Sequence, residues 1–126
     1  MSQAPQIQRE KRGARVKLGG SVLALLQLQN RRQVRTRLSQ LSANGGLLQL
    51  DNPLDEGILV EVLFHVGTTT VRSQAEMLFP MWATKGCLQP FRFKNLDETT
   101  HASLEQDLNA LLKTLPGAVA DDPNLP

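Results

Sequence analysis

Hydrophobic and polar residues alternate with a period of two along most of the chain, which predicts β-strands. Val34, Thr36 and Leu38 alternate with polar neighbours, and successive side chains of a strand point to opposite faces of a sheet. A nearly continuous apolar run in the first strand is typical of a buried strand, although periodicity alone leaves a short helix open there. We expect six short strands, over residues 16–28, 34–39, 47–50, 58–66, 71–79 and 88–93.

Glycine and proline interrupt these strands at informative positions. Gly19-Gly20 lies inside the first strand and predicts a bulge or a sharp bend. Asn44-Gly45 predicts a tight turn, because both residue types tolerate positive φ. Pro90 lies inside the last strand and indicates a sheet edge or a bulge, because proline has no N–H to donate.

The period changes after residue 96, and this predicts one amphipathic helix. Asp97 is a suitable N-cap and Glu98 suits the first turn, where negative charge is favoured. Pro116-Gly117 ends the helix. One apolar stripe is formed by leucines that recur every three or four residues, at Leu104, Leu108, Leu111 and Leu115.

Short strands joined by turns, followed by one helix, indicate a mainly β domain. Closing six antiparallel strands into a barrel removes the exposed sheet edges, and the helix should then cover an open end or a seam. At 126 residues the chain fits one domain. The expected organisation is a domain over residues 9–115, divided into a basic arm (9–15), a barrel (16–94) and a helix (97–115), between disordered tails at 1–8 and 116–126.

The net charge of +2 is unevenly distributed. Residues 1–17 hold five Lys and Arg against one Glu, and residues 31–37 hold four Arg and no acid, so the remainder is at −6. Two basic clusters on an otherwise acidic chain favour a local anionic partner over general adhesion to nucleic acid. Taken alone, each cluster is also typical of a solvated loop.

Catalytic and metal-binding patterns are weak. Neither His65 nor His101 stands in a pattern of Cys, Asp or Glu whose spacing signals a metal site, and Ser42 lacks a nucleophile-elbow pattern. The single cysteine, Cys87, reads as a small buried hydrophobe. We therefore expect neither enzymatic activity nor a metal or cofactor.

The compartment and the membrane topology follow from the same composition. One cysteine allows no disulfide framework within the chain, and the N-terminal residues are polar and charged, unlike a secretory signal. The apolar run at residues 22–26 is too short to span a bilayer. We expect a cytoplasmic protein.

Anion-binding chemistry is concentrated in a basic segment, Lys11-Arg12-Gly13-Ala14-Arg15, and a polar turn that follows the second strand, residues 40–46. A guanidinium offers a rigid fork that fits a phosphate bidentately, and it also pairs with O6 and N7 of guanine. A serine hydroxyl and glycine backbone in the turn allow close contact. The combination suits a guanine nucleotide with phosphates.

These two segments resemble the ligand motifs of the PilZ family, the bacterial receptor module for cyclic di-GMP. That family pairs an R-x-x-x-R arm with a [D/N]-x-S-x-x-G turn at the end of the second strand of a six-stranded barrel, and a helix follows. The segment from Gln40 to Gly45 matches the turn at Ser42 and at the glycine, and Lys11 and Arg15 stand where the arm has its two arginines. The run Pro90-Phe91-Arg92-Phe93 is similar to the family's last strand. The likeness covers residues 9–115.

The resemblance implies a cyclic di-GMP receptor or adaptor whose arm becomes ordered on ligand binding and which signals to an unidentified protein partner. Lys11 lacks the arginine fork, and Gln40 lacks the charge of Asp. Each loss could cost on the order of tenfold in affinity. The alternative is therefore a degenerate PilZ-like interaction module that binds the nucleotide weakly or not at all. The ligand residues implied are Lys11, Arg12, Arg15, Gln40, Ser42 and Gly45.

Nucleic-acid binding is a third and weaker hypothesis. Aromatic residues make up only 4% of the chain and tyrosine is absent, so few stacking platforms exist. A strict R-x-x-x-R also occurs from Arg31 to Arg35. It falls in the hairpin between the first two strands and leaves too little chain before Ser42 to be the arm.

Overall fold

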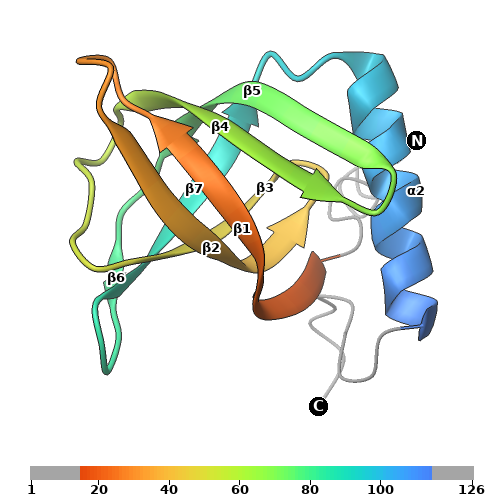
Figure 1. Cartoon of the computed structure of the whole chain (residues 1–126), viewed down its shortest axis with the longest axis horizontal. Coiled ribbons are helices and arrows are strands. Elements are labelled where there is room, and N and C mark those ends of the chain that lie inside the picture. Colours follow the sequence, from red (N-terminus) through yellow and green to blue (C-terminus); the bar gives the residue numbers. More distant parts are fainter. Residues whose placement is uncertain (1–14, 115–126) are drawn as a thin grey trace, which may run out of the picture.

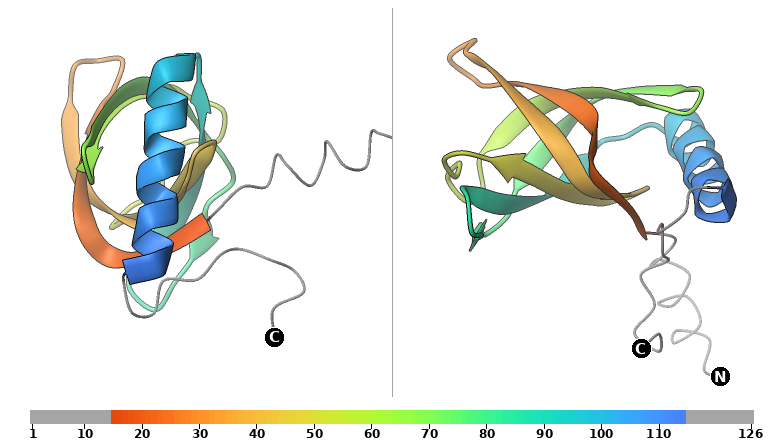
Figure 2. Two further views of the ribbon diagram at one scale, coloured as in Figure 1. Left: turned by 90° about the vertical axis from the view of Figure 1, so that its right-hand side faces the viewer. Right: turned by 60° about the horizontal axis from the view of Figure 1, so that its bottom comes forward.

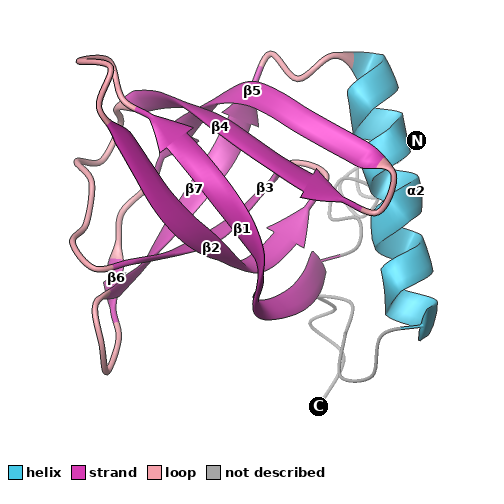
Figure 3. Cartoon of the chain, in the orientation of Figure 1, coloured by secondary structure: helices cyan, strands magenta, loops and turns pink. Residues whose placement is uncertain are grey.

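The computed structural model describes residues 15–114, which form a β-barrel with one helix across one of its ends (Figure 1; coloured by secondary structure in Figure 3). The tails expected at 1–8 and 116–126, most of the basic arm and the last residue of the expected helix lie outside the described residues. The elements are β1 (Arg15–Gln27), β2 (Gln33–Ser42), β3 (Gly45–Leu50), β4 (Leu59–Val66), β5 (Thr69–Met77), β6 (Met81–Trp82), β7 (Cys87–Lys94) and α2 (Glu98–Thr114).

Six strands close the barrel, as the sequence predicts. They follow the order β3-β2-β1-β4-β5-β7, and β3 pairs with β7 to complete the ring. Every pairing is antiparallel. Closure leaves no long edge among these six strands. The two-residue strand β6, which the sequence analysis did not predict, pairs only with the start of β7.

The period-two alternation correctly identifies the inward faces of β4 and β5. Val60, Val62 and Phe64 point into the core, and the buried positions of β5 alternate in the same way. The strand expected over residues 71–79 is too long at its end, where alternation would place Phe79 on the buried face of Met77: Phe79 is 70% exposed. The reason is that β5 ends at Met77. Beyond the end of a strand, side chains no longer point alternately inward and outward, even where the sequence pattern continues.

β1 bends where the sequence predicts it. Gly19 and Gly20 have φ values of 61° and 84°, and the register of β1 against β2 shifts between Lys17 and Val22. A side chain at positive φ would be strained, so glycine is what permits the bulge. The bend turns the first residues of β1 away from β4, which pairs only with residues 24–27.

Pro90 lies in a strand that is paired on both sides, yet its missing N–H causes no loss. Its carbonyl accepts a hydrogen bond from the Leu78 N–H at 2.8 Å, and the N and O atoms of one strand residue point to the same side. That side of β7 faces the break between β5 and β6. The edge or bulge that Pro90 predicts is therefore found in the neighbouring segment between β5 and β6, and not in β7 itself.

Helix α2 covers one open end of the barrel (Figure 2). Asp97 caps it as predicted: its carboxylate accepts from the Thr100 N–H at 3.1 Å and from the Thr100 hydroxyl at 2.6 Å. Leu104 and Leu108 are fully buried against the barrel core. Within the described part of the chain, no helix combines the length and apolarity needed to cross a membrane.

A carboxylate on the helix fixes it to the turn between β4 and β5. Asp107 accepts hydrogen bonds from the Thr68 N–H at 3.0 Å and the Thr68 hydroxyl at 3.1 Å, and also from the Thr69 hydroxyl. Ser103 lies 2.6 Å from the same Thr69 oxygen. These hydrogen bonds lower the pKa of Asp107 below its ordinary value, with the Thr69 hydroxyl as the largest cause. We call this set of contacts the helix lock.

Candidate functional site

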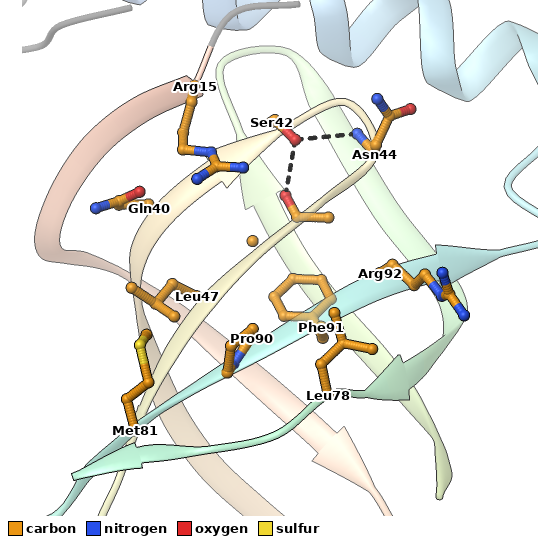
Figure 4. A pocket seen from close by; sticks show the side chains of 12 residues that line it. Arg15, Gln40, Ser42, Asn44, Leu47, Leu78, Met81, Pro90, Phe91 and Arg92 are labelled. Atoms are coloured by element: carbon orange, nitrogen blue, oxygen red, sulfur yellow. Dashed lines mark hydrogen bonds between the residues drawn. The ribbon is translucent and has the colours of Figure 1, made fainter. Parts of the chain in front are cut away.

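An open groove of about 390 Å³ lies on the outside of the barrel where β1 begins and β2 ends (Figure 4). Its volume falls in the range of small-molecule sites. Four of the six residues that the sequence analysis singled out line it together. They are Arg15, Gln40, Ser42 and Gly45. Lys11 and Arg12 lie outside the described residues.

Strand register explains why these residues meet. Arg15 is the Cα partner of Ser42, and Lys17 is the partner of Gln40. Opposite residues of an antiparallel pair place their side chains on the same face, here the outer one. Arg15, which the sequence assigns to the arm, is the first residue of β1, and its guanidinium extends over the groove beside Ser42 (Figure 4).

The hydroxyl of Ser42 is already engaged within its own turn. It accepts from the Asn44 N–H and donates to the Gly45 carbonyl, both at 3.2 Å. A hydroxyl has one donor and two acceptor lone pairs. Ser42 therefore retains acceptor capacity alone, which suits an N–H of a base better than a phosphate oxygen.

Gly45 and Gly46 serve the contact between β3 and neighbouring strands. A Cβ on Gly45 would lie 2.1 Å from the Phe91 carbonyl oxygen, and one on Gly46 would lie 2.5 Å from the Gln40 carbonyl oxygen. The predicted tight turn is present between Ser42 and Gly45, but the predicted reason for it is wrong, because Asn44 and Gly45 are not among the described residues with positive φ. Glycine is required by close backbone packing, which leaves less of its freedom for a ligand than the sequence suggested.

The other wall of the groove is apolar and was missed by the sequence analysis. Figure 4 shows Leu47, Leu78, Met81 and Pro90 across from Arg15. They come from β3, β7 and the segment around β6, so only the register of the barrel brings them together. One signal was available, since alternation in β7 places Pro90 on the opposite face from the buried Phe91.

The lining residues include no carboxylate, and this sets the electrostatics of the groove. Arg92, at the far end, pairs with Glu76 at 3.0 Å and is turned away from the centre. Arg15 is thus the cation that faces the groove. A polar, cationic wall opposite an apolar wall can hold a ligand that has both an anionic group and a flat apolar face. Among the described residues, no three His, Cys, Asp or Glu side chains gather as a metal site would require.

The Arg31 to Arg35 motif lies elsewhere, as the sequence analysis expected. It spans the β1–β2 hairpin and the start of β2, and neither arginine lines the groove.

Comparison with solved structures shows a PilZ-like fold. The structure titled "Crystal structure of YcgR in complex with c-di-GMP from Escherichia coli" superposes with a TM-score of 0.65 at 21% identity, over 73% of this chain and 41% of that one. The structure of the isolated PilZ domain of Escherichia coli YcgR with c-di-GMP gives 0.62 at 21% identity, over 79% of this chain and 88% of that one. The Bacillus subtilis inhibitor of motility, MotI/DgrA, gives 0.65 at 14% identity, over 80% and 50%.

The chain therefore corresponds to less than half of the YcgR chain and to half of MotI/DgrA. No model of a known protein family matches the sequence, and no curated protein matches it either. The fold predicted from the sequence, a six-stranded PilZ-like barrel with a C-terminal helix, is confirmed.

Proposed function

We propose that this chain is a receptor or adaptor domain for c-di-GMP. The ligand would occupy the groove, with Arg15 against a phosphate or a guanine edge, Gln40 and Ser42 accepting from base N–H groups, and Gly45 forming the floor. This division follows from the donor and acceptor capacities of the side chains.

The observation that carries the proposal is the pairing of Arg15 with Ser42 across β1 and β2. It brings the last residue of the basic segment to the turn that resembles the PilZ motif, over a groove with a cationic wall. Two of the solved structures with the same fold, both of Escherichia coli YcgR, hold c-di-GMP, which supports the choice of nucleotide.

The proposal includes an ordering step. Lys11 and Arg12 precede Arg15 by a few residues, so an arm that folds over the groove could add their charges to the same ligand. Ordering of a segment by a ligand is a common switching mechanism. We propose that the ordered arm is what a protein partner recognises.

Calorimetry tests the proposal directly. Titrating c-di-GMP into the purified chain at moderate salt should release or absorb heat, and Arg15→Ala should abolish binding or weaken it at least about tenfold. Unfolding by denaturant should change by less than about 1 kcal/mol in this variant, because Arg15 is exposed. Arg72→Ala is the matched control, since it removes an exposed arginine from β5, outside the groove.

Absence of heat at high nucleotide concentration, from a protein shown to be folded, would contradict the proposal. Equal binding by the Arg15 and Arg72 variants would contradict the assignment of the site, even if the nucleotide bound.

A second candidate function is a protein-interaction module that has lost nucleotide binding. Two observations favour it: Gln40 stands where the motif has Asp or Asn, and exposed apolar residues occur in and around β6, which borders the groove. Phe79 and Trp82 are 70% and 74% exposed, and Met81, 47% exposed, also lines the groove. Exposed apolar patches mark interaction sites on soluble proteins. A pull-down that retrieves the same partner equally with and without c-di-GMP would favour this function over the first.

A further inference from the structure

The charges of the described chain are segregated between two sides of the barrel. Residues 15–50, which form β1, β2 and β3, contain six Lys and Arg and no Asp or Glu. These three strands are neighbours in the sheet, so the charged side chains that they contribute to one side of the barrel are all positive. Eleven of the twelve acidic residues of the sequence come after residue 50.

Alternation directs these cations outward. Arg35 and Arg37 are exposed on β2, and the residues between and after them, Thr36 and Leu38, are buried. Side chains two residues apart on a strand are separated by about 6.6 Å. Arg35 and Arg37 thus form a short cationic row on the outer face of β2.

An exposed leucine lies beside this row, on the neighbouring strand β1. Leu23 on β1 is the Cα partner of Arg37 and is 63% exposed, and the partly exposed Leu25 is the partner of Arg35. Partners in an antiparallel pair share a face. We call the outer side chains of Leu23, Leu25, Arg35 and Arg37, together with Arg31 and Arg32 at the hairpin tip, the hairpin face.

Among the described residues, no arginine of the hairpin face forms an ion pair; Glu61 of β4, which lines the same hollow as Arg31, is paired with Arg72 at 3.9 Å. Ion pairs among the described residues join Arg72 to Glu61, and Arg92 and Lys94 to Glu76, all on β4, β5 and β7. Arg37 is fixed in place by one hydrogen bond, from its Nη1 to the Gly20 carbonyl at 3.0 Å, which leaves its other N–H groups available.

The tip of the hairpin holds an arginine in a strained conformation. Arg31 has a φ of 70°, a region that favours glycine or asparagine. Its turn is nevertheless well formed: the Leu28 N–H donates to the Arg32 carbonyl at 2.8 Å, and the Arg32 N–H donates to the Asn30 side chain at 2.9 Å. An arginine at this position adds charge to the hairpin face where glycine would fit the backbone better.

We propose that the hairpin face binds an acidic protein segment in which an apolar side chain is flanked by carboxylates. The arginine forks match carboxylates bidentately, and Leu23 offers an apolar contact at the centre, as protein interfaces do. The occupant is inferred from charge complementarity, because the positive hairpin face matches a segment rich in carboxylates. Single-stranded nucleic acid fits less well, because the hairpin face carries no aromatic side chain on which a base could stack.

This surface is separate from the groove and does not need a nucleotide in it. It offers a protein partner a further docking site, on β1 and β2 (Figure 1), apart from the arm and from the exposed apolar residues beside the groove. Binding to the hairpin face and binding to the groove can therefore fail independently.

The probe is a labelled peptide that alternates glutamate with leucine, followed by fluorescence anisotropy without nucleotide. Arg35→Glu should weaken binding about tenfold or more relative to Arg72→Glu, which makes the same charge change on the outer face of β5. Leu23→Ser should weaken it several-fold. Arg15→Ala, which disables the groove, should leave peptide binding unchanged.

Arg31→Gly separates charge from folding. It should weaken peptide binding while leaving stability against denaturant equal or higher, because glycine relieves the positive φ. A loss of stability together with unchanged binding would overturn the role given to the hairpin tip.

Equal weakening by Arg35→Glu and Arg72→Glu would mean that only net charge matters, and would overturn the proposal. So would a duplex oligonucleotide, or vesicles containing phosphatidylglycerol, binding at concentrations where the peptide does not. Amide shifts on adding peptide should concentrate in residues 22–37; an even spread over the barrel would also contradict it.

Discussion

Two hairpin turns of this barrel use the same residue types for different purposes. The β2–β3 turn carries Ser42 and Gly45 beside the groove, and the β4–β5 turn carries Gly67 and Thr68 under the helix. In the first, the hydroxyl bonds only within the turn itself. In the second, the N–H and hydroxyl of Thr68 both donate to Asp107.

The difference lies in where the anion comes from. The β4–β5 turn binds a carboxylate that the chain itself supplies from α2, and Gly67 leaves room for it: a Cβ there would lie 2.7 Å from Cγ of Asp107. The groove has cationic and polar side chains but no carboxylate in its lining. A hydroxyl and a glycine in a turn are thus insufficient evidence for a ligand site. The charged side chains around the turn decide whether the anion that it binds comes from the chain itself or from a ligand.

The largest expected effect comes from the glycine beside the groove. Gly45→Ala should destabilise the fold by about 3 kcal/mol or more, because the new Cβ would meet backbone atoms of β7 that cannot move aside. Chemical denaturation measures this loss. Gly57→Ala is the control, since its Cβ would meet nothing within 4 Å and only its φ of 90° is unfavourable. If both variants lose the same amount, tight packing is not the function of Gly45.

The next effect tests the helix lock. Asp107→Ala should cost about 2 kcal/mol, because it removes the acceptor of several hydrogen bonds to a charged group. Asp107→Asn should cost less, since the amide oxygen still accepts. Glu105→Ala on the same helix is the control, because Glu105 makes no hydrogen bond or ion pair with another described residue. Hydrogen exchange should report the loss as faster opening of α2; an unchanged exchange rate would contradict the lock.

Ser42→Ala should cost about 1 kcal/mol, the usual contribution of a buried hydrogen-bonded hydroxyl. The variant also sharpens the comparison between the two turns. If the remaining lone pair of Ser42 accepts from the ligand, as proposed, c-di-GMP affinity should fall about tenfold beyond the small loss of stability. Unchanged affinity would show instead that Ser42 serves only its turn.

The smallest effect is a pH dependence of the helix lock. Hydrogen bonds hold the pKa of Asp107 below its ordinary value of 3.8. A depressed folded-state pKa stabilises the fold above the unfolded value, and this contribution is lost as the pH falls through the folded value. Asp107→Asn should therefore flatten the acid side of the stability curve below the ordinary carboxyl pKa. Asp97, whose pKa is also lowered by hydrogen bonds from Thr100, keeps its own contribution to the pH dependence of stability in that variant.

The sequence predicted the elements that depend on local pattern. Alternation, apolar runs and turn residues located six strands, Gly19-Gly20 located the bend, and Asp97 located the start of the helix. The error at Phe79 has a simple cause, because alternation continues in the sequence after the strand pairing has ended. Strand β6 was missed because two residues have no periodicity.

Only one of the two walls of the groove could be predicted from the sequence. Its cationic and polar wall comes from two segments that resemble known motifs, so Arg15, Gln40, Ser42 and Gly45 could be singled out. Its apolar wall depends on the pairing of β3 with β7, which is long-range, and alternation in β7 gives a local signal for Pro90 alone. The steric role of Gly45 was hidden for the same reason, since the atom it must avoid belongs to Phe91.

The position of Trp82 has a practical consequence. The chain contains one tryptophan and no tyrosine, and that indole is 74% exposed on β6, next to the groove-lining Met81. Intrinsic fluorescence excited near the red edge of protein absorption therefore comes from a single point on the surface. Its emission should resemble that of indole in water, and any nucleotide or partner that covers this corner of the barrel should shift or quench it without a label.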